Sequence, residues 1–360
     1  MPSLLPIALG QTPSDNDVET LVQATLADSE RAAAFGITPE TAESAIRDRL
    51  QLLQAVYPSV RDLCCDRLGW ATTEATVAAQ LEMLWQLWLP LSMQLDQVQR
   101  AIARPLIQGI LGGQGTGKTT LAVILTHILT HLGHTVCEVS IDDLYKTYAD
   151  RQALQAQDAR LKWRGPPGTH DVELGIAALQ QLRDGVEAPV ALPRFDKALW
   201  DGAGDRVELV VVSNVDIVLF EGWFVGTRPV DPAVFETAPV PIVTESDRQF
   251  ARDMNAALRD YEPLWNLLDR LIVLSPVDYR LSKQWRQDAE QTMRAAGRGG
   301  MSDAEIEAFV TYFWRSLHPE LFIQPLCQPG SDVDMVVEIG ADHRPGRVYC
   351  PRLLPFTRVV

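Results

Sequence analysis

The feature that most constrains this chain is a glycine-rich segment, GGQGTGKTT at residues 112–120, which lies between two apolar runs. Residues 112–119 complete the pattern G-x-x-x-x-G-K-[ST]. The run at 106–111 predicts a buried strand, and the run at 121–132 has apolar residues at helical spacing. Glycines let successive backbone N–H groups turn toward an anion, and the following helix adds about half a positive charge at its N-terminus. The segment therefore predicts a phosphate-binding loop, or P-loop, between a strand and a helix.

A loop of this kind predicts a site for ATP and Mg²⁺. Lys118 is expected to reach the β- and γ-phosphates, and the Thr119 hydroxyl is expected to bind Mg²⁺. The alternative is a glycine-rich turn that matches by chance, which the order of strand, loop and helix disfavours. The residues expected to surround ATP are Gly112, Gly113, Gln114, Gly115, Thr116, Gly117, Lys118, Thr119 and Thr120.

Composition and charge limit the kind of partner that the chain can have. Its 360 residues, 46% of them apolar, are enough for one large α/β domain and a smaller one. The net charge of −15 argues against a nucleic-acid partner. No segment is long and uncharged enough to span a membrane. A small anionic substrate would therefore need a local group of Arg and Lys side chains.

The N-terminus and the cysteines predict a cytoplasmic protein. The first residues include Asp15, Asp17 and Glu19, and they lack both an apolar signal core and a basic transit pattern. The five cysteines fit neither a disulfide framework nor a zinc site. We therefore expect a soluble protein of a reducing compartment, while the oligomeric state stays undetermined by the sequence.

The pattern of apolar residues divides the chain into two regions. Residues 1–100 predict a helical extension, with a helix start at Thr38-Pro39-Glu40. An apolar stripe on another helix predicts a docking face rather than a cofactor site, and it consists of Leu81, Leu84, Trp85 and Trp88. Residues 101–360 alternate strands and helices, with strands expected at 106–111, 135–141, 215–220, 270–274 and 334–339. This order predicts an α/β fold of the P-loop type, a doubly wound and mainly parallel sheet with flanking helices.

Carboxylates follow two of these strands, at the sheet edge where ligands of such folds bind. Asp142 and Asp143 end the second strand, and an aspartate there suits a general base for a substrate hydroxyl. Helix capping is the alternative, and we expect it to hold for one of the two. Glu221 ends the third strand, where it could hold Mg²⁺ directly or through water, and a structural turn is the alternative.

The stretches GGQGTGKTT, SIDDLY and VLFEGW together resemble the uridine kinase, pantothenate kinase and phosphoribulokinase group of P-loop kinases. Three more stretches narrow the resemblance to the plant-type D-glycerate 3-kinases of plants, cyanobacteria and fungi: RGPPGTHD at 164–171, LPRFDKALWDGAGDR at 192–206 and WRQDAEQTMRAAGRGGMSDAEIEAFV at 285–310. The similarity covers about residues 100–345. It implies ATP-dependent phosphorylation of D-glycerate to 3-phosphoglycerate, in photorespiration or glycerate salvage.

The resemblance also implies roles for individual residues. Asp142 matches the catalytic base of the related kinases, and Glu221 matches the acidic residue after the third core strand. Glycerate is a small carboxylate, and arginine binds a carboxylate in a bidentate fork. The two loop stretches contain four cations that could bind such a carboxylate: Arg164, Arg194, Lys197 and Arg206. Any one of them could be a solvated surface charge, but that explanation fits all four together less well. The implied substrate-binding residues are Arg164, His170, Asp171, Arg194, Lys197 and Arg206.

Two other functions stay open at this point. A kinase of the same fold could act on another acceptor, such as a nucleoside, pantothenate or another sugar acid. A non-catalytic ATP-binding regulatory module would need neither the aspartate nor the basic loops, so their presence disfavours it.

Residues 278–318 predict a helical lid over the site. One helix is expected at 278–296, ended by Gly297, and a capping box from Ser302 to Glu305 is expected to start the next. The related kinases carry lid arginines on the corresponding helix, which implies that closure brings Arg286, with Lys283, over the phosphates.

The alternative for this helix is a solvated ladder of charges. Arg286, Glu290 and Arg294 follow at spacing four, so they share one face and could pair along it. The resemblance favours Arg286 as a third catalytic residue beside Lys118 and Asp142.

Overall fold

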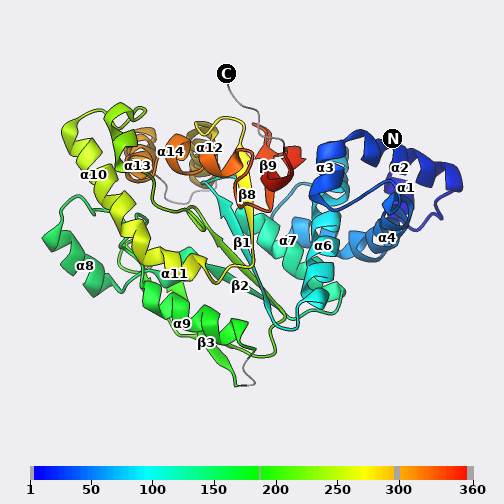
Figure 1. Cartoon of the computed structure of the whole chain (residues 1–360), viewed down its shortest axis with the longest axis horizontal. Coiled ribbons are helices and arrows are strands. Elements are labelled where there is room, and N and C mark those ends of the chain that lie inside the picture. Colours follow the sequence, from blue (N-terminus) through cyan, green and yellow to red (C-terminus); the bar gives the residue numbers. More distant parts are fainter. Residues whose placement is uncertain (1–3, 186–187, 296–300, 355–360) are drawn as a thin grey trace.

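The centre of the protein is a six-stranded sheet in the order β10-β9-β8-β1-β7-β2 (Figure 1). The computed structural model describes residues 4–185, 188–295 and 301–354. Five strands are parallel and β10 is antiparallel to β9 at one edge. The strands are β1 (Leu106–Gly112), β2 (Val136–Ser140), β7 (Ile217–Gly222), β8 (Arg270–Pro276), β9 (Met335–Ile339) and β10 (Pro345–Tyr349). The five predicted strands are therefore confirmed within two residues at each end, and the sixth strand of this sheet, β10 at its edge, was not predicted.

The two faces of the sheet bury different residues of the same strands, because neighbouring side chains of a strand point to opposite faces. Leu106 and Ile110 of β1 lie in the core under α7 (Lys118–His131), whereas Ile107 lies in the core on the other face. That second face is covered by α9 (Val172–Arg183), α10 (Glu245–Ala257) and α11 (Glu262–Trp265). Helices on both faces of a mainly parallel sheet confirm the predicted doubly wound fold.

Residues 4–101 form a group of helices, of which α4 and α6 pack on α7 (Figure 1, blue and cyan). The predicted docking stripe is buried in the same hydrophobic core as residues of β1 and α7. The helical elements are α1 (Leu4–Ala8), α2 (Asp15–Ala27), α3 (Ser29–Ala34), α4 (Ala42–Asp66), α5 (Glu74–Met83), the π-helical turn η1 (Leu84–Trp88) and α6 (Leu89–Ala101). The N-terminal helical region, as we call residues 4–101, thus shares one core with the sheet.

The predicted helix start, with Thr38 as the capping residue, is wrong by three residues, since Thr41 precedes α4, which begins at Ala42. Residues 38–41 form a turn in which the Thr38 N–H donates to the Thr41 hydroxyl at 3.0 Å. The turn uses the polar groups that would have capped a helix at Thr38.

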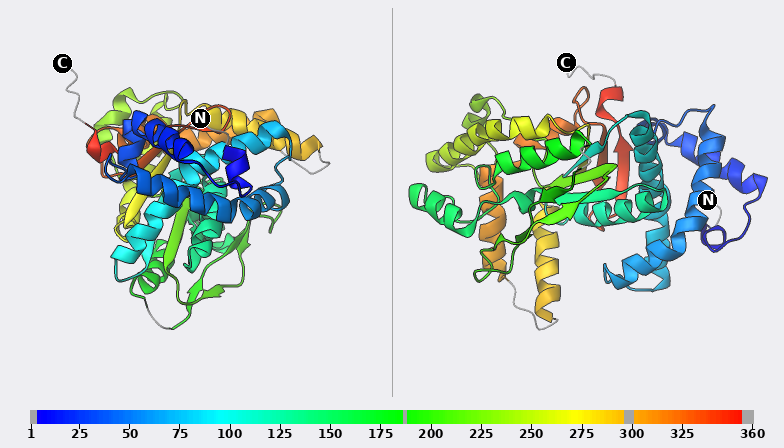
Figure 2. Two further views of the ribbon diagram at one scale, coloured as in Figure 1. Left: turned by 90° about the vertical axis from the view of Figure 1, so that its right-hand side faces the viewer. Right: turned by 90° about the horizontal axis from the view of Figure 1, so that it is seen from below.

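The segment predicted as a lid contains α12 (Leu281–Ala295) and α13 (Asp303–Ser316), which lie side by side and extend from the body of the protein (Figure 2, right). The predicted capping box at the start of α13 is present, with the Ser302 hydroxyl accepting from the Glu305 N–H. The first helix begins at Leu281 rather than Asp278, because its N–H donates to the Asp278 carbonyl in a turn. Its predicted last residue and the stop at Gly297 lie outside the described residues.

Shorter elements connect these parts. Two antiparallel pairs, β3 (Val190–Leu192) with β6 (Val210–Val212) and β4 (Phe195–Asp196) with β5 (Asp205–Arg206), were not predicted. The other short elements are η2 (Ile141–Leu144), α8 (Tyr148–Gln157), η3 (Pro232–Thr237), η4 (Leu258–Tyr261), α14 (Pro319–Phe322), η5 (Gln324–Cys327) and η6 (Pro351–Leu353). Within residues 4–185, 188–295 and 301–354, no helix combines the length and apolar character that a membrane crossing needs.

Candidate active site

The P-loop runs from the end of β1 to the start of α7, as the sequence predicts. Gly115 and Gly117 have φ of +77° and +85°, in the left-handed region that favours glycine. A Cβ atom on Gly115 would also lie 2.7 Å from the Cβ atom of Trp285 on α12. The loop therefore needs glycine for its backbone shape and for the close approach of the lid.

Beside the loop, Glu221 faces the two residues expected to hold phosphate and metal. Strands β1 and β7 pair in parallel, which brings the end of β7 next to the P-loop. The Thr119 hydroxyl lies 3.5 Å from Glu221 Oε1, and Lys118 Nζ lies 4.0 Å from Oε2. Burial raises the pKa of Glu221, and Lys118 opposes that shift. Glu221 Oε2 has no hydrogen-bond partner within the described residues, so a buried carboxylate oxygen is left for another ligand.

The two aspartates at the end of β2 have different surroundings. Asp143 caps η2: its carboxylate accepts from the Ser140 N–H at 3.1 Å and from Arg194 at 3.1 Å. Burial raises the pKa of Asp143, against the opposing hydrogen bond from Ser140 and charge of Arg194. Asp143 is thus the capping residue of the pair.

Asp142 instead points toward Lys197, whose Nζ lies 2.6 Å from its Oδ2. Burial favours the neutral acid, but the charge and hydrogen bond of Lys197 and a hydrogen bond from Tyr145 outweigh it, so the pKa of Asp142 lies below its ordinary value. Asp142 is therefore an ionised carboxylate at neutral pH, beside the loop that carries Lys118.

The basic residues of the loop stretch 192–206 converge on this carboxylate cluster. Arg194 bonds to Asp143 and to the Glu138 carbonyl at 3.2 Å. Arg206 pairs with Asp171 at 2.9 Å and donates to the Tyr145 carbonyl at 2.9 Å. Lys197 is the most exposed of the three, with 61% of its side chain accessible. These contacts place Arg194 and Arg206 as braces of the site and leave Lys197 accessible from solvent.

The stretch RGPPGTHD packs behind the same cluster. His170 is 2% exposed, its ring stacks on Tyr145 at 4.6 Å, and its Nδ1 lies 2.7 Å from the Tyr261 hydroxyl. Burial lowers the pKa of His170 to about 3, so the ring is neutral at neutral pH. Asp171 caps α9 by accepting from the Leu174 N–H. His170 and Asp171 thus hold the aromatic and basic residues that surround Asp142.

Arg164 lies on the far side of Tyr145, with its guanidinium 5.9 Å from the centre of that ring. It donates to the carbonyls of Gly202 and Ala203 at 2.7 and 3.0 Å. Arg151 of α8 donates to the Ala203 carbonyl at 2.9 Å, and both arginines lie over Phe195. Neither arginine has a carboxylate partner within the described residues, and burial with the charge of Arg164 lowers the pKa of Arg151.

Arg151 is the residue near the site that sequence reasoning missed. Its Nη1 atom is buried without a hydrogen-bond partner in the described structure. A cavity of about 290 Å³ lies against both arginines. In the sequence, Arg151 is marked only by its place in the segment that follows SIDDLY. That place does not distinguish it from a solvent-exposed residue of a helix.

On the lid, Arg286 is tied to Glu290 at 2.5 Å and lies over the Phe309 ring at 5.6 Å. Glu290 is 2% exposed and also accepts from the Met301 N–H at 3.0 Å. Arg294 pairs with Asp303 at 3.1 Å rather than with Glu290. Of the charge ladder that was the alternative for this helix, only the pair of Arg286 with the buried Glu290 is present among the described contacts. Lys283 forms an ion pair with Glu307 of α13.

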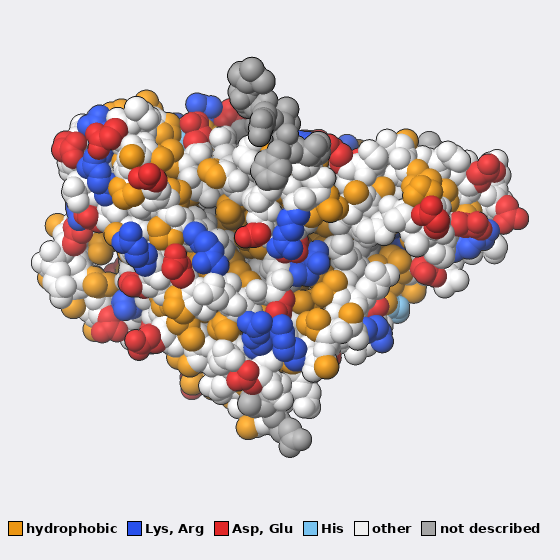
Figure 3. Space-filling view, viewed as in Figure 1, with side chains coloured by type: hydrophobic (Ala, Val, Ile, Leu, Met, Phe, Trp, Pro, Cys, Tyr) orange, Lys and Arg blue, Asp and Glu red, His pale blue; other side chains and the backbone are white. Residues whose placement is uncertain are grey.

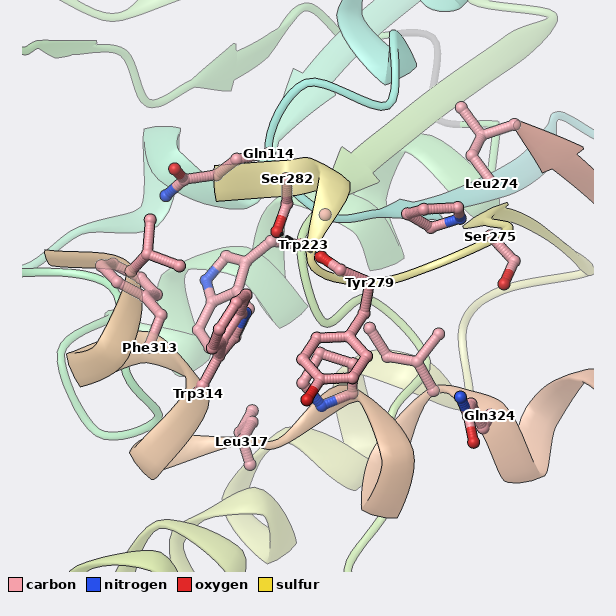
Figure 4. Close-up of a pocket in the computed structure, with 15 residues that line it drawn as sticks. Gln114, Trp223, Leu274, Ser275, Tyr279, Ser282, Phe313, Trp314, Leu317 and Gln324 are labelled. Atoms are coloured by element: carbon pink, nitrogen blue, oxygen red, sulfur yellow. Dashed lines mark hydrogen bonds between the residues drawn. The ribbon is translucent and has the colours of Figure 1, made fainter. Parts of the chain in front are cut away.

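An apolar cavity of about 80 Å³ separates the start of the P-loop from the lid helices (Figure 4). Gln114 borders it from the loop, and Phe313 and Trp314 border it from α13. Trp223, which follows Glu221 on the chain, contributes a further aromatic ring to its lining. Aromatic side chains thus line the space between the P-loop and α13.

On the face in Figure 3, basic and acidic side chains are interspersed rather than gathered into one broad basic surface. This arrangement suits a small anion better than an extended polyanion.

No model of a known protein family matches the chain. The sequence is 31% identical over 227 residues to an uncharacterized kinase of Schizosaccharomyces pombe, which covers 61% of this chain and 82% of that protein. It is also 31% identical over 253 residues to the chloroplastic D-glycerate 3-kinase of Arabidopsis thaliana, covering 66% of this chain and 53% of the plant protein. The solved structure of a D-glycerate 3-kinase from Cryptococcus neoformans superposes with a TM-score of 0.64 at 26% identity, over 72% of this chain and 96% of that one.

The chain belongs to the family of P-loop kinases that contains these three proteins. It is therefore an ATP-binding phosphotransferase, and the resemblance found in its motifs is confirmed. The similarity to the plant enzyme spans about half the length of that protein. The individual site residues stay predictions, for which the geometry above supplies the surroundings.

Proposed function

We propose that this kinase transfers the γ-phosphoryl group of ATP to the 3-hydroxyl of D-glycerate, giving 3-phosphoglycerate and ADP. The observation that carries the proposal is the position of Asp142, an ionised carboxylate next to the P-loop with a solvent-accessible lysine 2.6 Å away. The similarity to proteins named D-glycerate 3-kinase supports the choice of acceptor.

Asp142 is proposed as the general base, since its neighbour Asp143 is committed to capping η2 and to Arg194. In the transfer, the acceptor oxygen forms a bond to the γ-phosphorus as the bond to the β,γ-bridging oxygen breaks. The hydroxyl proton passes to an Asp142 oxygen, and ADP leaves with the negative charge of the broken bond. Lys118 is placed to stabilise the charge on the transferring group.

The carboxylate of the acceptor needs a cation that solvent can reach and that can bind a second anion. Lys197 meets that need, because its contact with Asp142 is at the surface and an incoming carboxylate can share the ammonium group. Arg164, whose present partners are backbone carbonyls, is the second cation that we propose for the acceptor. Arg194 and Arg206 are proposed to act on the acceptor through Asp143 and Asp171, which they hold in place.

The residues beside Lys118 fit a magnesium ion. Mg²⁺ prefers oxygen ligands and usually takes only one or two from the protein, with the rest from phosphates and water. The Thr119 hydroxyl and the unpartnered Oε2 of Glu221 would supply them. When bound, the ion neutralises part of the charge on the β- and γ-phosphates.

Closure of the lid is proposed to complete the site. Trp285 already packs on Gly115, so α12 and the P-loop are in contact at that point. A small rotation of α12 would carry Arg286 from Glu290 toward the phosphates. The cytoplasmic location and the role in photorespiration or glycerate salvage, both expected above, stay predictions.

The test is ATP-dependent conversion of D-glycerate, with the position of the phosphate in the product assigned by NMR. We expect phosphate on the 3-oxygen and little turnover of L-glycerate, pantothenate or uridine. Faster turnover of a neutral acceptor than of D-glycerate would contradict the proposed acceptor. ATP binding without transfer to any acceptor would favour a regulatory module.

A further inference from the structure

A cavity of about 750 Å³ lies between the P-loop and the N-terminal helical region. On one side it is lined by P-loop residues from Gly115 through Thr120. On the other side it is lined by residues of α5 and by Trp70, which precedes that helix. Two segments that are separated by some forty residues of chain thus face each other across an open space.

This cavity lies on the side of the P-loop where a nucleoside would leave the phosphates. The backbone of such a loop holds the α- and β-phosphates, and its lysine reaches the β- and γ-phosphates. The γ-phosphate must point toward Asp142 and Glu221, so the ribose and base must leave in the other direction. The second cavity that touches the loop, at Gly113 and Gln114, measures only about 80 Å³, too small for a nucleoside.

The wall on α5 has the composition that a flat, weakly polar base requires. Thr76, Ala79 and Met83 follow at spacings of three and four, so they share one face of the helix. Two of the three are small, which leaves room against the helix, and all three are partly exposed to the cavity. Trp70 adds an aromatic ring, which can stack on a base.

A third wall of the cavity is the turn between β9 and β10, which contacts both the P-loop and α5. His343 stacks on Trp285 at 4.6 Å, and its Nδ1 lies 3.0 Å from the Gly115 carbonyl. Arg344 lies 3.7 Å from Glu82 of α5, which links the turn to the N-terminal helical region. The space is therefore bounded by three segments that contact one another around it.

We propose that the N-terminal helical region supplies one wall of the nucleoside site of this kinase, so that residues outside the P-loop domain contact the base. The base lies against Thr76, Ala79 and Met83, with Trp70 at its edge, and the ribose lies near Thr120. This inference rests on the proposed function only in that the ligand is ATP. It gives the N-terminal helical region a role in nucleotide affinity, separate from its burial against α7.

The experiment fills the cavity from the α5 side. Ala79→Leu extends a side chain into the base position, and binding of ADP and of inorganic tripolyphosphate, each with Mg²⁺, is measured by calorimetry. We expect the Kd of ADP to rise by about tenfold or more, since a methylene-sized clash costs on the order of a kcal/mol or more. The Kd of tripolyphosphate, which has no base, is expected to stay within about twofold of wild type.

Ala78→Leu is the matched control, because Ala78 is exposed on the same helix and does not line the cavity. It makes the same change of volume and should leave both Kd values unchanged. Thermal unfolding of each variant checks the fold. If Ala79→Leu fails to fold, Trp70→Ala carries the same expectation, a weaker Kd for ADP with an unchanged Kd for tripolyphosphate.

A folded Ala79→Leu protein that binds ADP as tightly as wild type would overturn the inference. Equal weakening of ADP and tripolyphosphate would also overturn it, because α5 would then act on the P-loop rather than on the base. Selective loss of ADP binding in an enzyme that does not phosphorylate D-glycerate would support the subsite and contradict the proposed acceptor alone.

Discussion

The two sides of the P-loop are built from different kinds of side chain. On the acceptor side, charged groups hold one another: Lys197 contacts Asp142, and Arg194 contacts Asp143. On the side of the α5 cavity, the lining from the N-terminal helical region is uncharged. In the proposed function the acceptor side exchanges ion pairs when a substrate binds, whereas the proposed base site beside α5 only excludes water. The P-loop thus lies between a charged site proposed for the acceptor and a largely apolar wall proposed for the base.

Lys118 lies between the two sides, so its removal gives the largest effect expected here. Lys118→Ala should lower kcat by about 10³-fold or more, because the charge on the transferring phosphoryl group loses its closest cation. Its side chain is not part of a hydrophobic core, so the melting temperature should stay close to wild type. Near wild-type turnover would show that the loop has been misassigned.

The acceptor side is tested next by its two aspartates. Asp142→Asn should lower kcat by about 10²–10⁴-fold with little change in the Kd of ATP, since the amide cannot take the hydroxyl proton. Asp143→Asn should lower kcat less and should lower the melting temperature, because it weakens the cap of η2 and the contact with Arg194. Equal and severe losses of kcat in both variants would contradict the division of roles between them.

The lid gives a third test. Arg286→Ala should lower kcat by about 10²-fold, the typical loss for one donor to a transition state. It also leaves the buried Glu290 carboxylate without its cation, so stability should fall as well. Glu290→Gln is the control for that stability effect, and Arg294→Ala, which loses only the exposed pair with Asp303, should keep full kcat. Retention of more than about half of the wild-type kcat in Arg286→Ala would limit this arginine to a structural role.

The smallest expected effect is a shift in the pH profile. Lys197 helps to hold the pKa of Asp142 below its ordinary value, so Lys197→Ala should raise that pKa. A base acts when it is deprotonated, so the acidic limb of kcat/KM should move to higher pH. Lys197→Arg keeps the charge and should leave the limb near its wild-type position. If the acidic limb of Lys197→Ala stayed in place or moved to lower pH, Lys197 would not be what lowers the pKa of the catalytic base.

Much of the acceptor side could be predicted from the sequence because its signals are local. The P-loop is a continuous eight-residue pattern, Glu221 lies at the end of the predicted strand β7, and Asp142 lies in η2, directly after the predicted strand β2. The same local logic located the capping box of α13. It failed at Thr38, where a turn closed by the Thr41 hydroxyl takes the place of the expected helix start.

The α5 side could not be predicted in the same way, since its contacts join distant parts of the chain. The link between Glu82 and Arg344 and the one between Gly115 and His343 each span more than two hundred residues. Such contacts depend on how the sheet brings β9 and β10 beside the N-terminal helices. The position of Arg151 and Arg164 over Phe195 could not be predicted for the same reason. Phe195 belongs to the short β4–β5 pair, which the sequence does not signal.

The shared core described above also bears on the order in which the chain acquires its structure during synthesis. Trp85 and Trp88 are buried in the same core as Met335 and Val337 of β9. About 250 residues therefore leave the ribosome between Trp85 and Met335, which takes on the order of tens of seconds. Over that interval the apolar stripe of the N-terminal helices has no complete surface to pack on. The nascent chain consequently presents a hydrophobic face that a chaperone can bind, and that exposure ends only when β9 has emerged and joined the sheet.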